Sequence, residues 1–259
     1  MPPAVSFAEN LRKKEGIKLK IYSKTDIGRK REINQDAFYV GEFSNGAAFV
    51  VVCDGMGGAK SGNVASEKAA SVISEYIVKS YSPKMSSVGI ENLLRAAVES
   101  ANCEVYDLAH SDAKYEGMGT TVVVALIIDN LAHIVHVGDS RAYLVTATEI
   151  EQITVDHSVV QSMVNKGEIS AEEAKIHPQK NIITRAVGAE KDVMCDYNIV
   201  LKPDNATLLI CTDGLSGQLD EASLFETVKN TPAELCVETL VNMANEAGGP
   251  DNITAVLVY

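Results

Sequence analysis

The chain has 259 residues, of which 46% are hydrophobic, and its formal net charge at pH 7 is −12. This length is enough to bury one substantial core, so a globular protein is expected. The negative charge argues against nucleic acid as a partner, because a surface that binds phosphate backbones needs clustered lysine and arginine. The charge favours solubility or, more specifically, a group of carboxylates that bound cations neutralise.

Export from the cell and insertion into a membrane are both disfavoured. Residues 1–14 lack an apolar run and place their basic cluster after the apolar residues, the reverse of the order in a signal peptide. The longest apolar runs reach about eight residues, whereas a membrane span needs about 20. The five cysteines share no short spacing, which is typical of buried thiols in a reducing compartment. A cytoplasmic protein without a membrane partner is therefore expected.

The chain is expected to form one domain behind a short extension. No repeat and no linker rich in proline, glycine or serine divides it, which predicts an N-terminal extension at 1–17 and a single domain at 18–259. Within the extension, Ser6 and Glu9 form the capping-box pattern and favour a helix at 7–14. A frayed terminus is the alternative, and no function is assigned to the extension.

Runs rich in valine, isoleucine and threonine predict a strand-rich protein. We expect strands at 18–23, 37–42, 47–53, 120–128, 131–137, 142–146, 206–211 and 252–258. Apolar residues at helical spacing predict amphipathic helices at 63–79 and 90–109. A third helix, 233–247, follows Thr231 as N-cap and Pro232 as first helical residue. Because the long helices come as a consecutive pair and strands meet through tight turns, an α+β fold of antiparallel sheets flanked by helices is favoured.

Two apolar strands end in the dipeptide Asp-Gly, at Asp54 and Asp213. After a single apolar run this dipeptide is most often a hairpin turn, and that interpretation stays open for each of them alone. Neither position fits a hairpin well, because Asp54 leads toward a predicted helix and Asp213 leads into a short stretch that ends at Gly217. Each strand instead delivers a carboxylate to its end.

Two further aspartates follow the same pattern. Asp139 lies in a turn between two predicted strands, and Asp251 directly precedes the last strand. Carboxylates gathered in one half-buried place would repel one another, so such a cluster is stable only when it is protonated, paired with cations or coordinated to metal. Ligands that are all oxygen select hard ions, namely Mg²⁺, Mn²⁺ or Ca²⁺.

Other ion and nucleotide sites are disfavoured. His133 and His136 are three apart on a strand and should point to opposite faces, which argues against a zinc pair. Residues 57–61 lack the glycine that precedes the lysine of a phosphate-binding loop. The series of aspartates that marks an EF-hand does not occur in the sequence.

Ten short motifs occur in an order that resembles the bacterial-type metal-dependent protein phosphatases, type 2C, also called the PPM family. They lie at residues 25–28, 31–36, 54–58, 117–121, 137–141, 156–158, 177–179, 183–188, 212–214 and 249–252. Each motif alone is weak evidence, whereas the ordered series is specific, and the resemblance covers 18–259. It implies a four-layer α-β-β-α sandwich, in which two mostly antiparallel sheets are flanked by helix pairs and a metal site opens at one edge between the sheets.

The resemblance also implies a set of metal ligands. Asp54 would bridge two Mn²⁺ or Mg²⁺ ions, and the backbone carbonyl of Gly55 would bind one of them. Asp213 and Asp251 would complete the site of the other ion. Asp139 resembles the ligand of a third, weaker ion, with Asp213 shared.

Catalytic roles follow from the same resemblance. Arg31 would clamp the substrate phosphate, since a planar guanidinium offers two parallel donors to phosphate oxygens. An isolated arginine would more often form a surface ion pair. Asp36 would contribute to the metal site indirectly, by hydrogen bonding to metal-bound water. Water activated between the two ions would attack phosphorus in line, with Arg31, Asp36, Asp54 and Asp213 as the catalytic residues.

Several positions need separate treatment. Met56 stands where animal relatives often have histidine, and Gln35 where many relatives have glutamate, so the donor of the leaving-group proton stays open. His177 lies in a polar stretch, residues 158–180, that resembles the flap of bacterial relatives. It would bind substrate, with a helix-terminal or solvent-exposed histidine as the alternative. Cys53 and Cys211 precede two of the aspartates, so by strand alternation they should face away from the metals and pack in the core.

The function expected from this resemblance is hydrolysis of phosphoserine and phosphothreonine in proteins, in opposition to a Ser/Thr kinase pathway. A monomer in the cytoplasm is expected, with signalling as its role. Two alternatives stay open: a phosphatase dedicated to one regulatory protein of the anti-sigma antagonist type, and a catalytically dead module that binds metal or partners.

Overall fold

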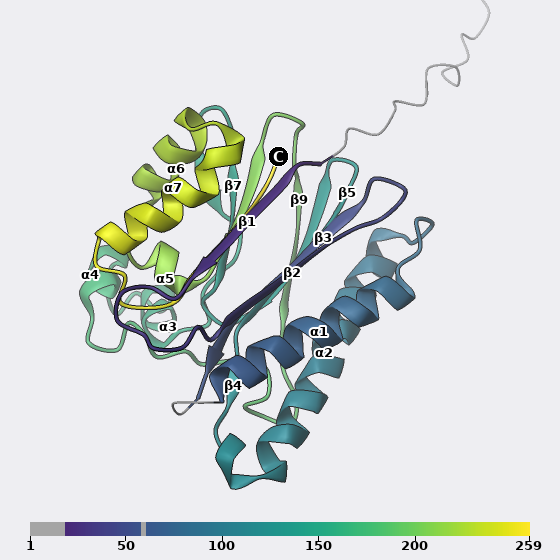
Figure 1. Cartoon of the computed structure of the whole chain (residues 1–259), viewed down its shortest axis with the longest axis vertical. Coiled ribbons are helices and arrows are strands. Elements are labelled where there is room, and N and C mark those ends of the chain that lie inside the picture. Colours follow the sequence, from purple (N-terminus) through teal and green to yellow (C-terminus); the bar gives the residue numbers. More distant parts are fainter. Residues whose placement is uncertain (1–18, 58–60) are drawn as a thin grey trace, which may run out of the picture.

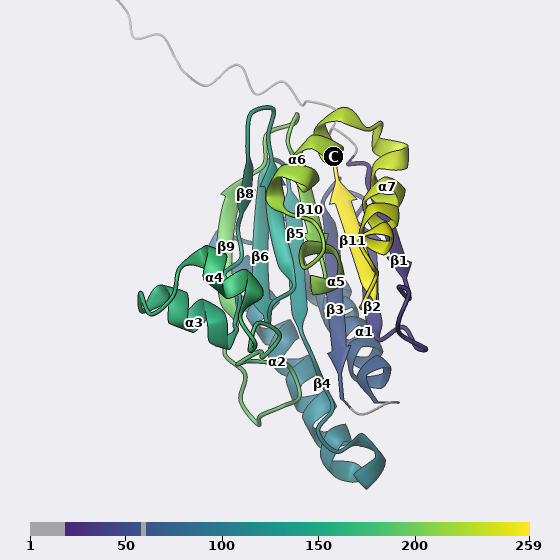
Figure 2. The same cartoon turned by 90° about the vertical axis from the view of Figure 1, so that its left-hand side faces the viewer.

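The structure is a computed structural model that describes residues 19–57 and 61–259, in which two sheets pack face to face with helices outside them (Figure 1). Seen from the side, the layers follow the order helices, sheet, sheet, helices, which confirms the expected α-β-β-α sandwich (Figure 2). The helix expected at 7–14 lies outside the described residues. Among the helices of the described part of the chain, none combines the length and the apolar character that a membrane span requires.

The first sheet has the strand order β1-β11-β10-β7-β8, and each pair of neighbours is antiparallel. Its strands are β1 (Ile21–Asp26), β7 (Arg141–Val145), β8 (Ile150–Gln152), β10 (Thr207–Cys211) and β11 (Ile253–Val258).

The second sheet has the order β2-β3-β5-β6-β9, again antiparallel at each pairing, and the short strand β4 pairs with the end of β3. Its strands are β2 (Asp36–Glu42), β3 (Ala48–Met56), β4 (Gly119–Thr120), β5 (Val122–Ile128), β6 (Leu131–Val137) and β9 (Asp196–Leu201).

A pair of helices covers the outer face of each sheet (Figures 1 and 2). The helices α1 (Gly62–Ser80) and α2 (Ser87–Ser111) pack on the second sheet, and a 3₁₀ turn at Ala113–Tyr115 follows them. The helices α6 (Glu221–Asn230) and α7 (Ala233–Glu246) pack on the first sheet. Two short helices, α3 (Val159–Asn165) and α4 (Ala171–Ile176), project from the side of the sandwich. The single turn α5 (Asp213–Ser216) follows β10 directly.

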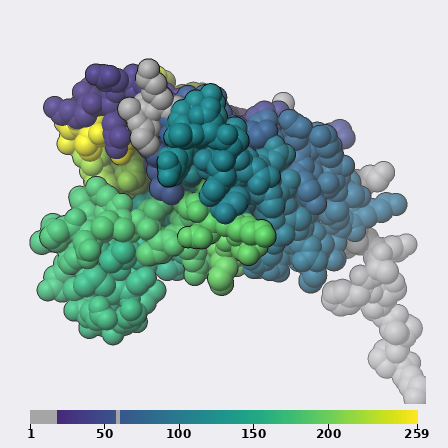
Figure 3. Space-filling model, turned by 90° about the horizontal axis from the view of Figure 1, so that it is seen from below, coloured from purple at the N-terminus to yellow at the C-terminus, as the bar shows by residue number. Residues whose placement is uncertain are grey.

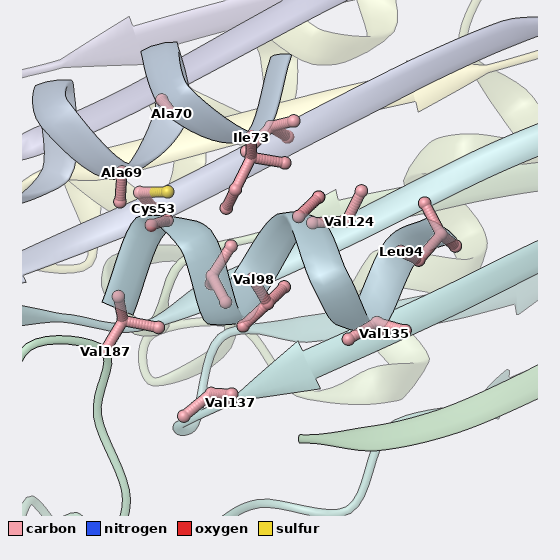
Figure 4. Close-up of a cluster of buried hydrophobic side chains, with 14 of the residues drawn as sticks. Cys53, Ala69, Ala70, Ile73, Leu94, Val98, Val124, Val135, Val137 and Val187 are labelled. Atoms are coloured by element: carbon pink, nitrogen blue, oxygen red, sulfur yellow. The ribbon is translucent and has the colours of Figure 1, made fainter. Parts of the chain in front are cut away.

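Strand β3 shows why the core strands are apolar without a break. Its side chains alternate between two buried surfaces: Val50 and Val52 lie between the sheets, whereas Val51 and Cys53 face the helices α1 and α2. Figure 4 shows Cys53 among the side chains of those helices. A strand buried on both faces needs apolar residues at every position. The packing role expected for Cys53 and Cys211 is confirmed, since both are fully buried in hydrophobic clusters.

The predicted elements are largely confirmed, with corrections at their ends. The strand expected at 18–23 lies at Ile21–Asp26, because its partner β11 pairs with it from Val258 to Ile253. The strand expected at 120–128 is interrupted at Thr121, whose backbone N–H donates to the carbonyl of Asp54 (2.9 Å) instead of continuing the ladder. Helix α7 begins at Ala233 as expected, but its N-cap is Pro232 and not Thr231, and it ends at Glu246, one residue earlier than expected.

Elements that are short or largely polar were not predicted from the sequence. These are β8, β9, α3, α4, α5 and α6. Strand β9 is an edge strand that alternates half-buried and exposed residues, and β8 has three residues. Helix α6 carries a recognisable N-cap, since the side chain of Asp220 accepts from the N–H of Ser223 (2.9 Å), but only Leu224, Thr227 and Val228 of its ten residues are buried. Short or polar elements are fixed by their neighbours and so leave a weak pattern in the sequence.

Candidate metal centre

Aspartates from both sheets meet at one edge of the sandwich. Within the described residues they are Asp36, Asp54, Asp139, Asp213 and Asp251, and the negative charges of the other four all act on Asp54. Asp54 and Asp36 are cross-strand partners near the end of β3 and the start of β2. Asp213 begins α5 immediately after β10. Because β3 and β10 belong to different sheets and end at the same edge, their carboxylates come together (Figures 1 and 2).

Asp36 is held in place by threonines from the opposite sheet. Its Oδ2 accepts hydrogen bonds from the hydroxyls of Thr212 (2.9 Å) and Thr254 (2.6 Å). Its Oδ1 is buried and has no hydrogen-bond partner among the described residues, and the same is true of Oδ1 of Asp213. A buried carboxylate oxygen without a partner costs about 1–3 kcal/mol, and more when it is charged. These two oxygens therefore need a ligand that accepts their lone pairs.

The carboxylates of the cluster are hard to ionise together. Burial raises the pKa of Asp36 to about 7, with further contributions from the charges of Asp213 and Asp251. Burial, and then the charge of Asp213, raise the pKa of Asp139 to about 7. Burial, and then the neighbouring carboxylates, raise the pKa of Asp54 well above its ordinary value. The carboxylates therefore cannot all be ionised at neutral pH unless further positive charge enters the cluster.

A hard divalent cation fits this cluster. Bound Mn²⁺ or Mg²⁺ would neutralise several carboxylates at once and would accept a lone pair from the unpartnered oxygen of Asp213, while ion-bound water would donate to that of Asp36. All the side-chain donors of the cluster are carboxylate oxygens, which suits these ions better than zinc.

Gly55 lies where three segments approach closely. A Cβ at this position would lie 2.0 Å from the carbonyl oxygen of Gly62, the first residue of α1, so a side chain has no room. The N–H of Gly55 donates to the carbonyl of Gln35 (3.0 Å), which also accepts from the hydroxyl of Ser66 (2.6 Å). Gln35 therefore links the β2 end of the cluster to β3 and α1 through its backbone.

Arg31 reaches the cluster from the loop between β1 and β2. Its Nη2 donates to Oδ2 of Asp251 (2.7 Å), and about half of its side chain is exposed. The buried side chain of Asn252 shapes this loop: its Nδ2 donates to the carbonyls of Ile27 (2.9 Å) and Ile33 (3.1 Å), and its Oδ1 accepts from the N–H of Gln35 (2.8 Å). Asn252 thus holds the segment that presents Arg31.

The turn that carries Asp139 is fixed by reciprocal hydrogen bonds. The N–H of Gly138 donates to Nδ1 of His157 (3.1 Å), and the N–H of His157 donates to the carbonyl of Gly138 (2.9 Å). Gly138 has φ of 104°, a conformation that favours glycine. Thr121 joins this turn to the rest of the cluster, because its hydroxyl contacts that of Ser140 (2.8 Å) and accepts from the N–H of Asp54 (3.0 Å).

A second group of potential metal ligands lies nearby but already holds a cation. Ligand atoms of His136, His157 and Asp196 lie within 4.8 Å of one another. Nη1 of Arg185 donates to Oδ1 of Asp196 (2.8 Å) and lies 3.1 Å from Nε2 of His157. The guanidinium supplies the positive charge that a metal would bring. His133 bonds instead to the hydroxyl of Tyr197 through its Nδ1 (2.7 Å), apart from this group.

His177 ends helix α4, and its Nδ1 accepts from the N–H of Gln179 (3.1 Å). His177 is thus helix-terminal, and its side chain is half-buried.

The sequence did not identify Thr121, Thr212, Thr254 or Asn252 as supports of the cluster, although three of them lie inside the recognised motifs. Thr212 and Asn252 lie directly beside strand-end aspartates in the sequence, and this position was the available indication that they support the cluster.

Comparison with known proteins agrees with this geometry. The family model for protein phosphatase 2C matches residues 27–257. The chain is 39% identical to the serine/threonine phosphatase stp of Listeria monocytogenes, covering 91% of this chain and 93% of that protein. It is 38% identical to the protein phosphatase PhpP of Streptococcus pneumoniae, covering 90% of this chain and 94% of that protein.

Solved structures are similar over almost the whole chain. The serine/threonine phosphatase of S. agalactiae matches with a TM-score of 0.87 and 34% identity, covering 93% of this chain and 99% of that one. The catalytic domain of the phosphatase PstP, in complex with 2 manganese ions, matches with a TM-score of 0.81 and 30% identity, covering 93% of this chain and 97% of that one.

Proposed function

The chain belongs to the protein phosphatase 2C family, and from this premise we propose how its own residues carry out the reaction. It is a metal-dependent phosphoprotein phosphatase that hydrolyses phosphoserine and phosphothreonine. The observation that supports the residue assignment is the cluster of five aspartates, in which two buried carboxylate oxygens lack a partner among the described residues.

We assign the metal ligands as follows. Asp54 would bridge two Mn²⁺ or Mg²⁺ ions, the carbonyl of Gly55 would bind one, and Asp213 and Asp251 would hold the other. Asp139 would hold a third ion with Asp213, because the turn at Gly138 presents it toward that residue's charge. When bound, the ions supply an activated water for in-line attack and neutralise charge on the phosphate.

The remaining roles belong to the side chains around the ions. Arg31 would bind two phosphate oxygens and so orient the phosphoryl group for attack. Asp36, fixed by Thr212 and Thr254, would accept a hydrogen bond from water through its free Oδ1. The hydroxyls of Thr212 and Thr254 act to lower the pKa of Asp36, because hydrogen bonds to a carboxylate stabilise its charged form, and so favour its ionisation when cations are bound.

The wider role is also a proposal. We expect the protein to act as a monomer in the cytoplasm, on phosphoproteins of a Ser/Thr kinase pathway, as part of signalling. His177 on the flap stays a prediction as a substrate contact. A dedicated phosphatase for one regulator and a catalytically dead module are less favoured, because the cluster and Arg31 are complete and the relatives are named as a protein phosphatase and a serine/threonine phosphatase.

Hydrolysis of p-nitrophenyl phosphate and of a phosphothreonine peptide tests the proposal. Purified protein should hydrolyse both with Mn²⁺ and neither after removal of metal. Asp54→Asn and Asp213→Asn should abolish both activities. Asp129→Asn is a matched control, since Asp129 is exposed on a turn with φ of 52°, which asparagine also adopts. Equal activity in all these proteins would contradict the assignment.

A further inference from the structure

Beside the metal centre, the described residues line a pocket of about 310 Å³. Met56 forms part of its wall and lies two residues beyond Asp54 on β3. Most of the remaining wall comes from the segment 183–194, which follows the flap. Figure 3 views the molecule from the end where this segment, in green, lies between the α3–α4 region and the teal end of α2.

The segment that forms the wall is firmly held. The buried side chain of Asn102 on α2 accepts from the N–H of Gly188 (2.7 Å) and donates to the carbonyls of Glu190 (3.0 Å) and Lys191 (2.9 Å). Val187 and Thr120 exchange two backbone hydrogen bonds, of 3.0 and 2.8 Å. Since the hydroxyl of Thr120 also donates to the carbonyl of Asp54 (2.9 Å), the pocket and the metal centre share one framework. The pocket is therefore preformed and fixed in position relative to Asp54.

The chemistry of the pocket is apolar with an acidic rim. Met56, Ala186 and Val193 line it, and so do the acidic residues Glu190 and Asp192, both of which are exposed. Arg185 also lines the pocket, but its guanidinium is bound to Asp196 (2.8 Å), so its charge is compensated. The charge left for a ligand is negative.

We propose that this pocket binds a lysine or arginine side chain of the substrate, two residues away from the phosphorylated serine or threonine. The inference rests on the proposed function and deepens it. The aliphatic stem of such a side chain would pack on Met56 and Val193, and its charged end would reach Glu190 and Asp192.

The position along the substrate follows from strand geometry. Residues two apart on a strand lie on the same face, about 7 Å apart, as Asp54 and Met56 do on β3. A substrate in extended conformation has the same repeat. Its phosphorylated residue at the metal centre therefore places the second residue along at the pocket, while the adjacent residue points away.

The test compares peptides that contain one phosphothreonine and differ only at the residue two positions away from it. This residue is lysine, leucine or glutamate. For the unmodified enzyme with Mn²⁺, kcat/KM should be about three- to tenfold higher for lysine than for glutamate, and the ratio should shrink at high salt, because exposed charge pairs are modest and screened. The combined variant Glu190→Gln with Asp192→Asn should lose this ratio while its hydrolysis of p-nitrophenyl phosphate is unchanged. Retained hydrolysis of the small substrate also shows that the variant is folded.

A second variant tests the pocket without changing its charge. Ala189 lines the pocket and is exposed, so Ala189→Phe should fill the space and lower kcat/KM for the lysine peptide, again with p-nitrophenyl phosphate unaffected. Asp129→Asn with Glu149→Gln, two exposed acids outside the pocket, is the control that should keep the lysine preference. A preference that is absent in the unmodified enzyme, or that survives in both pocket variants, would overturn this inference. Failure of all hydrolysis with Mn²⁺ would instead overturn the proposed function.

Discussion

The metal centre and the flap are built in opposite ways. The carboxylates of the centre lie at the ends of core strands or in the turns beside them. The hydroxyls of Thr212 and Thr254 donate to Asp36, and the hydroxyl of Thr121 accepts from the N–H of Asp54. The flap, residues 158–180, consists of two short helices held largely by their own caps, such as the capping box of Ser170 and Glu173. Rigid support suits ligands that must meet an ion within a fraction of an ångström. An exposed arm is free to vary with the substrate without disturbing that geometry.

The strongest test of this contrast is removal of the central carboxylate. Asp54→Asn should lower kcat by at least about a thousandfold, because the ions would lose the ligand expected to bridge them. The same variant should raise the melting temperature of metal-free protein at about pH 8, since a neutral amide removes repulsion among the clustered aspartates. Steady-state kinetics and thermal denaturation measure the two effects. A variant with normal kcat would show that the centre does not need this ligand.

The support of Arg31 should matter more than any single contact of the flap. Asn252→Ala leaves the carbonyls of Ile27 and Ile33 and the N–H of Gln35 without their partner. With about 1–3 kcal/mol for each buried group left unpaired, and partial relaxation of the loop, we expect a loss of about 2–4 kcal/mol in the free energy of unfolding. We also expect kcat/KM to fall about 10- to 100-fold, because Arg31 would lose its position. Urea denaturation measures the free energy of unfolding, and steady-state kinetics measure kcat/KM. If both values in Asn252→Ala equalled those of the unmodified protein, Asn252 would not support Arg31.

The charge of the centre also predicts a pH dependence. The pKa of Asp36 and of Asp139 is raised from 3.8 to about 7 in the folded protein. Between those values the folded state binds more protons than the unfolded state, so the free energy of unfolding of metal-free protein falls as pH rises through this window. Mn²⁺ requires the ionised carboxylates, so its stabilising effect should grow over the same window.

Thermal denaturation with and without Mn²⁺, from about pH 5.5 to pH 8, checks this prediction. Each proton displaced changes the apparent affinity by about tenfold per pH unit below the raised pKa. An increase in melting temperature caused by Mn²⁺ that is equal at both ends of the range would show that the carboxylates are already ionised without metal.

The smallest effect is expected on the flap. Ile176→Ser changes a side chain that is 84% exposed, so the free energy of unfolding should change by less than about 0.5 kcal/mol. Hydrolysis of p-nitrophenyl phosphate should be unchanged, because this substrate does not extend beyond the metal centre. A large loss of stability would mean that the flap packs as part of the core.

The same contrast explains what the sequence could and could not predict. Strands such as β3 and β5 are buried on both faces, so their long apolar runs predicted them, and the run of β3 placed Asp54 near a strand end. The flap helices and β9 have no such pattern, and their caps alone did not reveal them. The supports of the site were also hidden, because a buried Asn252 or Thr254 differs from an exposed one only in its tertiary partners.

The central claim is that the aspartates at one edge of the sandwich form one cluster that binds cations. Titration calorimetry with Mn²⁺ is its most direct test. The unmodified protein at about pH 8 should bind at least two ions, with release of protons that grows as the pH is lowered. Asp54→Asn should lose the tight binding, whereas Asp129→Asn should keep it. Equal stoichiometry and affinity in Asp54→Asn and the unmodified protein would contradict the claim.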